Sequence, residues 1–181
     1  GKTTASSMAT FIMDCCGASP GFLIGGIPGN FPVSARLGES DWFVIEADEY
    51  DTAFFDKRSK FLHYRPDVLL MGNLEFDHAD IFSSLEDIKT QFSHLLRSVP
   101  PNGSVVINSD DLDLRDVLEQ GCWSKVVEFS CQDESCEWFV QAVTEDASQF
   151  DVYQSGRLLS RVTWPLFGAH NMMNALGAIA S

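Results

Sequence analysis

Short apolar runs alternate with longer amphipathic stretches over most of the chain, and this pattern predicts alternating strands and helices. The run at 42–47 is apolar up to Glu46, which is typical of a strand that is covered on both faces. The run at 67–71 predicts a second buried strand. Further strands are expected at 21–26, 61–64, 104–108 and 125–129.

Apolar positions at helical spacing predict four helices, and turn residues or caps bound most of them. Gly17 is the expected end of the first helix, and Pro100 ends the second. Ser83 and Glu86 have the spacing of a capping box for the second helix, and Asp110 is the expected cap of the third. The four helices are expected at 3–13, 85–99, 111–120 and 172–180.

Toward the C-terminal end the pattern changes to strands with no helices between them. These strands are expected at 138–144, 149–153 and 158–163, with a hairpin turn at 154–157. The chain is therefore expected to be α/β, with a mainly parallel sheet of the P-loop type flanked by helices and a small antiparallel β unit in its C-terminal half. Ligands of such sheets bind at the carboxyl ends of the strands.

Composition excludes several classes of protein. The chain has 181 residues, enough for one domain with a full core. Its formal net charge of −14 argues against nucleic acid or an anionic membrane as the main partner, because both need a basic surface. No apolar run reaches about 18 residues, so no transmembrane helix is expected. The five cysteines form no CxxC pair and are expected to be reduced thiols of a cytoplasmic protein.

The first four residues, Gly1, Lys2, Thr3 and Thr4, match the end of a phosphate-binding loop, G-x-x-x-x-G-K-[ST]. In such a loop backbone N–H groups and the lysine bind phosphate, and the hydroxyl that follows the lysine binds Mg²⁺. The helix that follows would point its positive end at the phosphate. The first half of the motif and its preceding strand are absent from the sequence, and an ordinary helix start is the alternative.

Acidic residues follow the strand expected at 42–47, where a phosphate-loop enzyme needs a carboxylate for Mg²⁺. Glu46, Asp48, Glu49 and Asp51 all qualify, and a solvated loop is the alternative. His78 follows the strand at 67–71 and could help hold a second divalent ion. A structural histidine is the alternative reading of His78.

Two amides near the start of the last expected helix, Asn171 and Asn174, offer paired donors and acceptors. Such an amide can pair with N6 and N7 of adenine. The alternative is that Asn171 is an ordinary helix cap.

Taken together, these motifs resemble the Mur ligases. The matching stretches occur in the family's order and are Gly-Lys-Thr-Thr at 1–4, Glu-Ala-Asp-Glu-Tyr-Asp at 46–51, Asn-Leu-Glu-Phe-Asp-His at 73–78 and Gly-Ala-His-Asn-Met-Met-Asn-Ala-Leu at 168–176. The whole chain is similar to the family's central ATP-binding domain. Three further stretches, 25–31, 34–38 and 51–60, resemble the members that join UDP-N-acetylmuramate to the tripeptide L-Ala-γ-D-Glu-meso-diaminopimelate in cell-wall recycling. Members that add L-alanine are the next most similar.

The resemblance implies an ATP-dependent amide ligation. A carboxylate attacks the γ-phosphate of ATP, and an amine then attacks the resulting acyl phosphate. By this match Lys2, Glu46 and His78 are the expected catalytic residues. The expected Mg²⁺ ligands are Thr3, Glu46 and His78, and the expected ATP-binding residues are Gly1, Lys2, Thr3, Thr4, His170, Asn171 and Asn174.

The resemblance also sets the domain organisation. Residues 1–181 are expected to form one central domain, truncated at its N-terminus, without the family's N-terminal domain for the UDP-sugar and its C-terminal domain for the amine. The isolated chain is therefore expected to be inactive. Some family members use a carbamylated lysine after the position of His78, but Lys89 lies at an unsuitable spacing and is not assigned that role. A P-loop kinase or NTPase and a non-catalytic nucleotide-binding domain are the rival hypotheses.

Overall fold

The computed structural model describes residues 1–48, 51–53, 56–75 and 84–181, and the side chains of all of these except 51–53 and 56–58. The helices are α1 (Lys2–Cys15), the short 3-10 helix η1 (Lys60–His63), α2 (Leu85–Ser98), α3 (Leu112–Glu119) and α4 (Ala169–Ala180). The strands are β1 (Gly21–Leu23), β2 (Ala35–Arg36), β3 (Phe43–Ile45), β4 (Asp51–Ala53), β5 (Asp56–Ser59), β6 (Val68–Met71), β7 (Ser104–Asn108), β8 (Lys125–Ser130), β9 (Trp138–Ala142), β10 (Gln149–Gln154) and β11 (Arg157–Thr163).

A six-stranded sheet in the order β11-β10-β9-β8-β7-β6 forms the centre of the fold. Strands β6 to β9 run parallel, whereas β9, β10 and β11 are antiparallel. The predicted α/β class is confirmed. The predicted antiparallel unit is present in the C-terminal half, where it extends the parallel sheet through β9.

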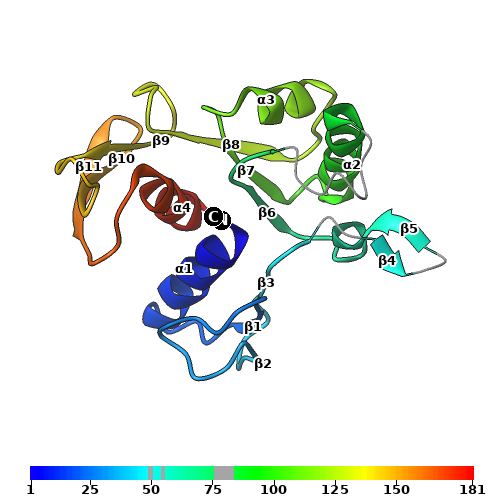
Figure 1. Ribbon diagram of the computed structural model, residues 1–181, viewed down its shortest axis with the longest axis horizontal. Helices are drawn as coiled ribbons and strands as arrows, with labels where there is room; N and C mark the ends of the chain where they lie inside the picture. Colours follow the sequence, from blue (N-terminus) through cyan, green and yellow to red (C-terminus); the bar gives the residue numbers. More distant parts are fainter. Residues whose placement is uncertain (49–50, 54–55, 76–83) are drawn as a thin grey trace.

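Helices cover both faces of this sheet, with α2 and α3 on one side and α4 on the other (Figure 1). The alternation of side chains along β6 shows this. Leu69 and Met71 pack with the helices α2 and α3, whereas Val68 and Leu70 pack with α4. Each face therefore has its own apolar core, as the continuous apolar sequence of a doubly covered strand requires.

A second, three-stranded sheet has the order β2-β1-β3, with β1 parallel to β3. Phe22 of β1 is fully buried and packs with Val44 of β3. Phe43, on the opposite face of β3, is 52% exposed, and Trp42, just before the strand, is 55% exposed. The prediction that the strand at 42–47 is covered on both faces is therefore wrong for the described chain. The apolar residues of this strand therefore lie on one buried face and one solvent-exposed face.

One arginine fastens α1 to this small sheet. The guanidinium of Arg36 lies over the rings of Phe22 and Phe31, at 5.3 and 5.1 Å from their centroids. It also forms an ion pair with Asp14 of α1 and donates to the carbonyl of Pro20 at 3.1 Å. The stacked and paired cation fixes the end of α1 against β1 and β2, which in turn positions the start of the helix.

Two predicted caps differ from the observed ones by one residue. The cap of α2 is Ser84 rather than Ser83, and its hydroxyl accepts from the N–H of Asp87 at 3.2 Å. The cap of α3 is Asp111 rather than Asp110. Its carboxylate accepts from the N–H of Leu114 at 3.0 Å and from the N–H of Leu74 at 2.9 Å, so one side chain caps the helix and ties down the segment after β6.

Asp110 has a different task. Its carboxylate accepts from the hydroxyl of Ser130 and, at 2.9 Å, from the N–H of Cys131. It thereby joins the ends of β7 and β8. On sequence grounds either Asp110 or Asp111 could cap the helix. The contacts of Asp110 with the end of β8 leave Asp111 as the cap.

The segment 61–64, expected to be a strand, is instead helical. Residues 60–63 form η1, and the N–H of Tyr64 bonds to the carbonyl of Phe61 at 3.2 Å. One helical turn lets Phe61, Leu62 and Tyr64 pack into the same core cluster. A strand would send alternate side chains to opposite faces.

The hairpin expected at 154–157 joins β10 to β11 as predicted. Its two central residues, Ser155 and Gly156, have positive φ angles of 49° and 74°. Positive φ at both central positions defines the turn type that suits the twist of a two-residue hairpin. Strands β2, β4 and β5 have no counterpart among the predicted elements.

Candidate active site

The start of α1 lies beside the end of β3, and a glutamate connects them. The hydroxyl of Thr3 donates to Oε1 of Glu46 at 2.7 Å. The backbone N–H of Gly25 donates to Oε2 of the same carboxylate, also at 2.7 Å. Both oxygens of Glu46 are therefore held, one by a side chain of α1 and the other by the backbone after β1.

The register of the small sheet explains this arrangement. Leu23 pairs with Ile45 in the parallel β1–β3 ladder, and the N–H of Glu46 continues it by donating to the carbonyl of Leu23 at 3.0 Å. Gly25 and Glu46 therefore leave neighbouring strands at the same carboxyl end. This is the end at which ligands of parallel sheets bind.

A lysine completes the group. The ammonium of Lys2 lies 3.3 Å from a carboxylate oxygen of Asp48, and the two side chains are 46% and 38% exposed. Solvent screens a pair of this kind, so it contributes little to stability. Gly1 is the helix cap, and its carbonyl accepts from the N–H of Ala5 at 3.1 Å. No acidic side chain lies in the first turn of α1, so its positive end is available to an anion.

The structure describes only some of the other residues that were predicted for this region. Thr4 is half-buried in the first turn of α1. Asp51 begins β4, but its side chain is not described, and Glu49 and His78 lie outside the described residues. Within the described chain, no three His, Cys, Asp or Glu side chains are placed to share a metal ion.

The predicted residues of α4 behave differently from one another. The cap of α4 is Gly168, with a positive φ of 90°, so the alternative of Asn171 as an N-cap is wrong. The amide of Asn171 instead donates to the carbonyl of Phe167 at 2.8 Å. The Nδ2 atom of Asn174 is buried and has no hydrogen-bond partner among the described residues. His170 is exposed, and its ring lies close over Gly168.

Helices α1 and α4 pack against each other, since Met8 of α1 contacts the core cluster that includes Met172 and Leu176. In Figure 1 the two chain termini lie close together in the view, where α1 begins and α4 ends. The structure thus groups Lys2, Thr3, Glu46 and Asp48 at one place and puts the amides of α4 on the helix packed beside it.

Gly25 is a member of this group that the sequence analysis did not single out. Its signal is a glycine directly after a buried strand, a position where backbone approaches a ligand or a functional side chain closely. A Cβ at this position would lie 3.1 Å from Oε2 of Glu46, which is tighter than most contacts of real Cβ atoms. The sequence offered no means of pairing this glycine with Glu46, because the pairing depends on sheet register.

Comparison with known proteins decides the family. The model of the Mur ligase middle domain matches residues 1–181, which is the entire chain. The chain belongs to the Mur ligase family. The resemblance to this family that the sequence motifs indicated is thereby confirmed over the full length of the chain.

Three relatives show where this Mur ligase domain lies within the family. It is 54% identical over 181 residues to the UDP-N-acetylmuramate--L-alanyl-gamma-D-glutamyl-meso-2,6-diaminoheptandioate ligase of Escherichia coli K12. It is 33% identical over 184 residues to the UDP-N-acetylmuramate--L-alanine ligase of Syntrophomonas wolfei. The solved structure of the UDP-N-acetylmuramate:L-alanyl-gamma-D-glutamyl-meso-diaminopimelate ligase from Neisseria meningitides is 51% identical with a TM-score of 0.91, and the match covers 99% of this chain and 57% of that one.

The chain spans only part of its curated relatives. It is matched completely by the Escherichia coli and Syntrophomonas wolfei enzymes but covers 39% and 38% of their lengths. Among the described residues of this Mur ligase domain, none of the helices combines the length and apolar character needed to cross a bilayer.

Lys89 of this Mur ligase domain is held in a purely ionic setting. Its ammonium lies 2.7 Å from a carboxylate oxygen of Asp113 and 2.7 Å from one of Asp116, and the lysine is 6% exposed. Hydrogen bonds to these two aspartates raise the pKa of Lys89 above its usual value. Two carboxylates therefore share the ammonium of Lys89.

Replacing Lys89 by methionine is expected to lower the melting temperature by several degrees, because it leaves Asp113 and Asp116 facing each other without their shared cation. Asp116→Asn is the matched control, since it leaves the Lys89–Asp113 pair intact and should cost less. Thermal unfolding followed by circular dichroism measures both. Equal melting temperatures for wild type and Lys89→Met would show that the cluster adds nothing to stability.

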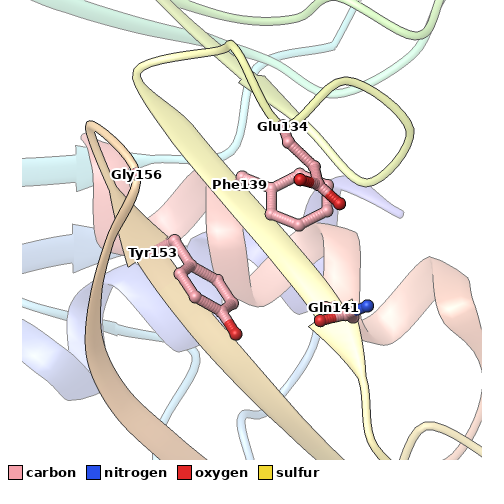
Figure 2. Close-up of a pocket in the computed structure, with 5 residues that line it drawn as sticks. All are labelled: Glu134, Phe139, Gln141, Tyr153 and Gly156. Carbon is pink, nitrogen blue, oxygen red and sulfur yellow. The ribbon is translucent and has the colours of Figure 1, made fainter.

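A pocket of about 140 Å³ lies elsewhere in this Mur ligase domain (Figure 2). It is formed by strands β9 and β10, the hairpin that follows and the connection between β8 and β9, and its lining residues are Glu134, Phe139, Gln141, Tyr153 and Gly156. The rings of Phe139 and Tyr153 form its wall, with centroids 5.8 Å apart. It contains none of the residues that the sequence predicted for the active site.

Proposed function

We propose that the protein containing this chain is an ATP-dependent ligase that joins UDP-N-acetylmuramate to L-Ala-γ-D-Glu-meso-diaminopimelate in peptidoglycan recycling. The single observation that carries the proposal is the 54% identity over the whole chain to the Escherichia coli ligase named for these substrates. The 33% identity to an L-alanine ligase makes L-alanine the less favoured amine. The grouping of Lys2, Thr3 and Glu46 supports the ATP-dependent part of the proposal.

In the proposed reaction the muramyl carboxylate attacks the γ-phosphate of ATP, releases ADP and becomes an acyl phosphate. The amine of the tripeptide then attacks the acyl carbon, and inorganic phosphate leaves. The first step brings two anions together, so neutralising charge is the main task of the site. We propose that Lys2 and the N–H groups at the start of α1 contact the β- and γ-phosphates.

The residues present fit Mg²⁺. Two neighbouring ligands of an octahedral ion with bonds of 2.0–2.1 Å lie about 2.9 Å apart. The Thr3 hydroxyl and Oε1 of Glu46 are 2.7 Å apart, so a small separation would let both bind one ion. When bound, the ion would neutralise phosphate charge and polarise the transferred phosphoryl group. His78 is proposed to help hold a second ion.

The residues also fit the adenine of ATP. A buried amide nitrogen without a partner is costly, and Asn174 has one in the described structure. An adenine acceptor would satisfy it. Asn171 keeps one bond to Phe167 and has its amide oxygen for the base, with His170 exposed beside it. We propose that Asn171 and Asn174 bind adenine and that Gly1 and Thr4 complete the phosphate site.

Replacing Asn174 by leucine separates a nucleotide-binding role from a structural one. We expect about tenfold weaker ATP binding, because a hydrogen bond to the base is lost. Without nucleotide the melting temperature should stay the same or rise, because an unpartnered buried donor is removed. Calorimetric titration with ATP and thermal unfolding test the pair of results. A lower melting temperature with unchanged ATP affinity would assign Asn174 to the fold alone.

The division of labour follows from the share of the relatives that this chain covers, 39% of the Escherichia coli enzyme. We propose that this domain supplies ATP binding and phosphoryl transfer, and that other domains of the full protein bind the UDP-sugar and the amine. The isolated chain should not form an amide bond. All five cysteines are free, which fits the proposed cytoplasmic location.

The full-length protein tests the proposed function directly. It is incubated with UDP-N-acetylmuramate, ATP and Mg²⁺, and with either the tripeptide or L-alanine as amine, and amide product and phosphate are measured. Product with the tripeptide is the expected result. Product with L-alanine alone would reassign the substrate, and ATP hydrolysis that needs neither carboxylate nor amine would favour a simple NTPase.

A further inference from the structure

Both oxygens of Glu46 are occupied, but by donors of different kinds. Thr3 holds Oε1 through a hydroxyl, which can rotate and can also act as a ligand to an ion. Gly25 holds Oε2 through a backbone N–H, which can only donate. The two oxygens of one carboxylate are therefore not equivalent toward a metal ion.

The orientation of the Gly25 N–H is fixed by hydrogen bonds of the neighbouring backbone. The residue before it, Ile24, donates its N–H to the carbonyl of Ser34 at 2.9 Å, and Glu46 donates its own N–H to Leu23 at 3.0 Å. Both backbones are thus tied into the small sheet on either side of the 2.7 Å bond. An ion that took both oxygens of Glu46 would leave the Gly25 N–H without its acceptor.

We propose that Gly25 is a positioning residue that keeps Glu46 a one-oxygen metal ligand and so makes the site select Mg²⁺ over Ca²⁺; the inference rests on the proposed function. Mg²⁺ takes six ligands in a small octahedron and binds carboxylates through one oxygen. Ca²⁺ takes six to eight ligands at 2.3–2.6 Å, often including both oxygens of a carboxylate. Occupation of Oε2 by a fixed donor disfavours the second geometry.

The same geometry explains why this position holds glycine. A Cβ would lie 3.1 Å from Oε2, so an alanine would push the carboxylate away from the Gly25 N–H. Gly29, in the same loop, has no atom within 4 Å of such a Cβ and is exposed. Gly25→Ala and Gly29→Ala therefore form a matched pair that adds the same methyl group with and without contact to Glu46.

The test uses the full-length protein and titrates ADP by calorimetry in the presence of Mg²⁺ or Ca²⁺. The wild type and Gly29→Ala should bind ADP more tightly with Mg²⁺ than with Ca²⁺. Gly25→Ala should bind Mg²⁺·ADP about tenfold more weakly, as expected when a supporting contact of a metal ligand is lost, with a smaller change for Ca²⁺·ADP. An unchanged ratio of the two affinities in Gly25→Ala would overturn the proposal.

A second measurement needs no variant and so does not depend on the folding of Gly25→Ala. Hydrogen exchange of the Gly25 amide is followed by NMR in the wild type with ADP and either ion. The amide should stay protected with Mg²⁺ and exchange faster with Ca²⁺, which competes for Oε2. Loss of protection with Mg²⁺ would refute the one-oxygen geometry. If the wild type binds ADP without any dependence on a divalent ion, the proposed function itself fails along with this inference.

Discussion

Glu46→Gln in the full-length protein is expected to lower kcat/KM by about 10³-fold, with little change in melting temperature. The substitution keeps size and shape but removes the charge that a divalent ion requires. The local bonds can be kept, because the glutamine oxygen can accept from the Gly25 N–H and its NH₂ group can donate to the Thr3 hydroxyl, which is also an acceptor. Steady-state assays at several Mg²⁺ concentrations measure the loss.

Glu128→Gln is the matched control for this variant. Glu128 is a half-buried glutamate like Glu46, but it lies in β8 within the six-stranded sheet. Its replacement should leave kcat/KM close to that of the wild type. Activity of Glu46→Gln within about threefold of the control would show that Glu46 is not a metal ligand, because loss of such a ligand costs far more.

The second large effect is expected for Lys2→Met, which should also lower kcat/KM by about 10³-fold by removing a cation from the developing phosphate charge. Stability should hardly change. The pair between Lys2 and Asp48 is 3.3 Å long and both side chains are well exposed, so it adds little to the folded state. A large loss of activity at constant melting temperature is therefore the specific expectation.

Lys125→Met provides the comparison, because Lys125 is an exposed lysine at the start of β8. It removes one positive charge from the same acidic protein without touching the start of α1. ATP affinity should fall only in Lys2→Met. A similar fall in both variants would mean that overall charge, rather than a local phosphate contact, governs nucleotide binding.

The sequence predicted those elements whose signals are local. Strand β7 was expected at 104–108 and is found there, and α2 ends at Ser98, just before the expected stop at Pro100. The hairpin at 154–157 was also visible, because a serine and a glycine accept the left-handed backbone that its turn needs. In each case one short stretch of residues contains the whole physical reason.

Features that depend on distant partners could not be predicted in this way. Strand β2 has two residues and exists because Arg36 and Ala35 pair with Phe22 and Leu23. The side chains of Trp42 and Phe43 were expected to be buried, but both are exposed. The sequence could not show this, because an apolar run does not reveal which face of a strand is covered. Short strands and open faces are decided by tertiary packing, which outweighs local preference.

The same limit applies to the candidate site. Lys2 and Thr3 were recognisable from the phosphate-loop motif, and Glu46 from its position at the end of an expected strand. The part played by Gly25 was hidden, because its backbone N–H meets the Glu46 carboxylate only through the pairing of two strands, and its own side chain contributes nothing. The role of His78 stays a prediction, since it lies outside the described residues.

The division of the parallel strands between two sheets affects how the separate domain would behave in solution. In the described part of the chain, β3 ends one sheet and β6 ends the other, so each has a row of backbone groups open to a further strand. At the start of β3 the apolar rings of Trp42 and Phe43 are exposed as well. Unprotected edges with apolar neighbours promote intermolecular strand addition, so dilute samples would suit the domain best.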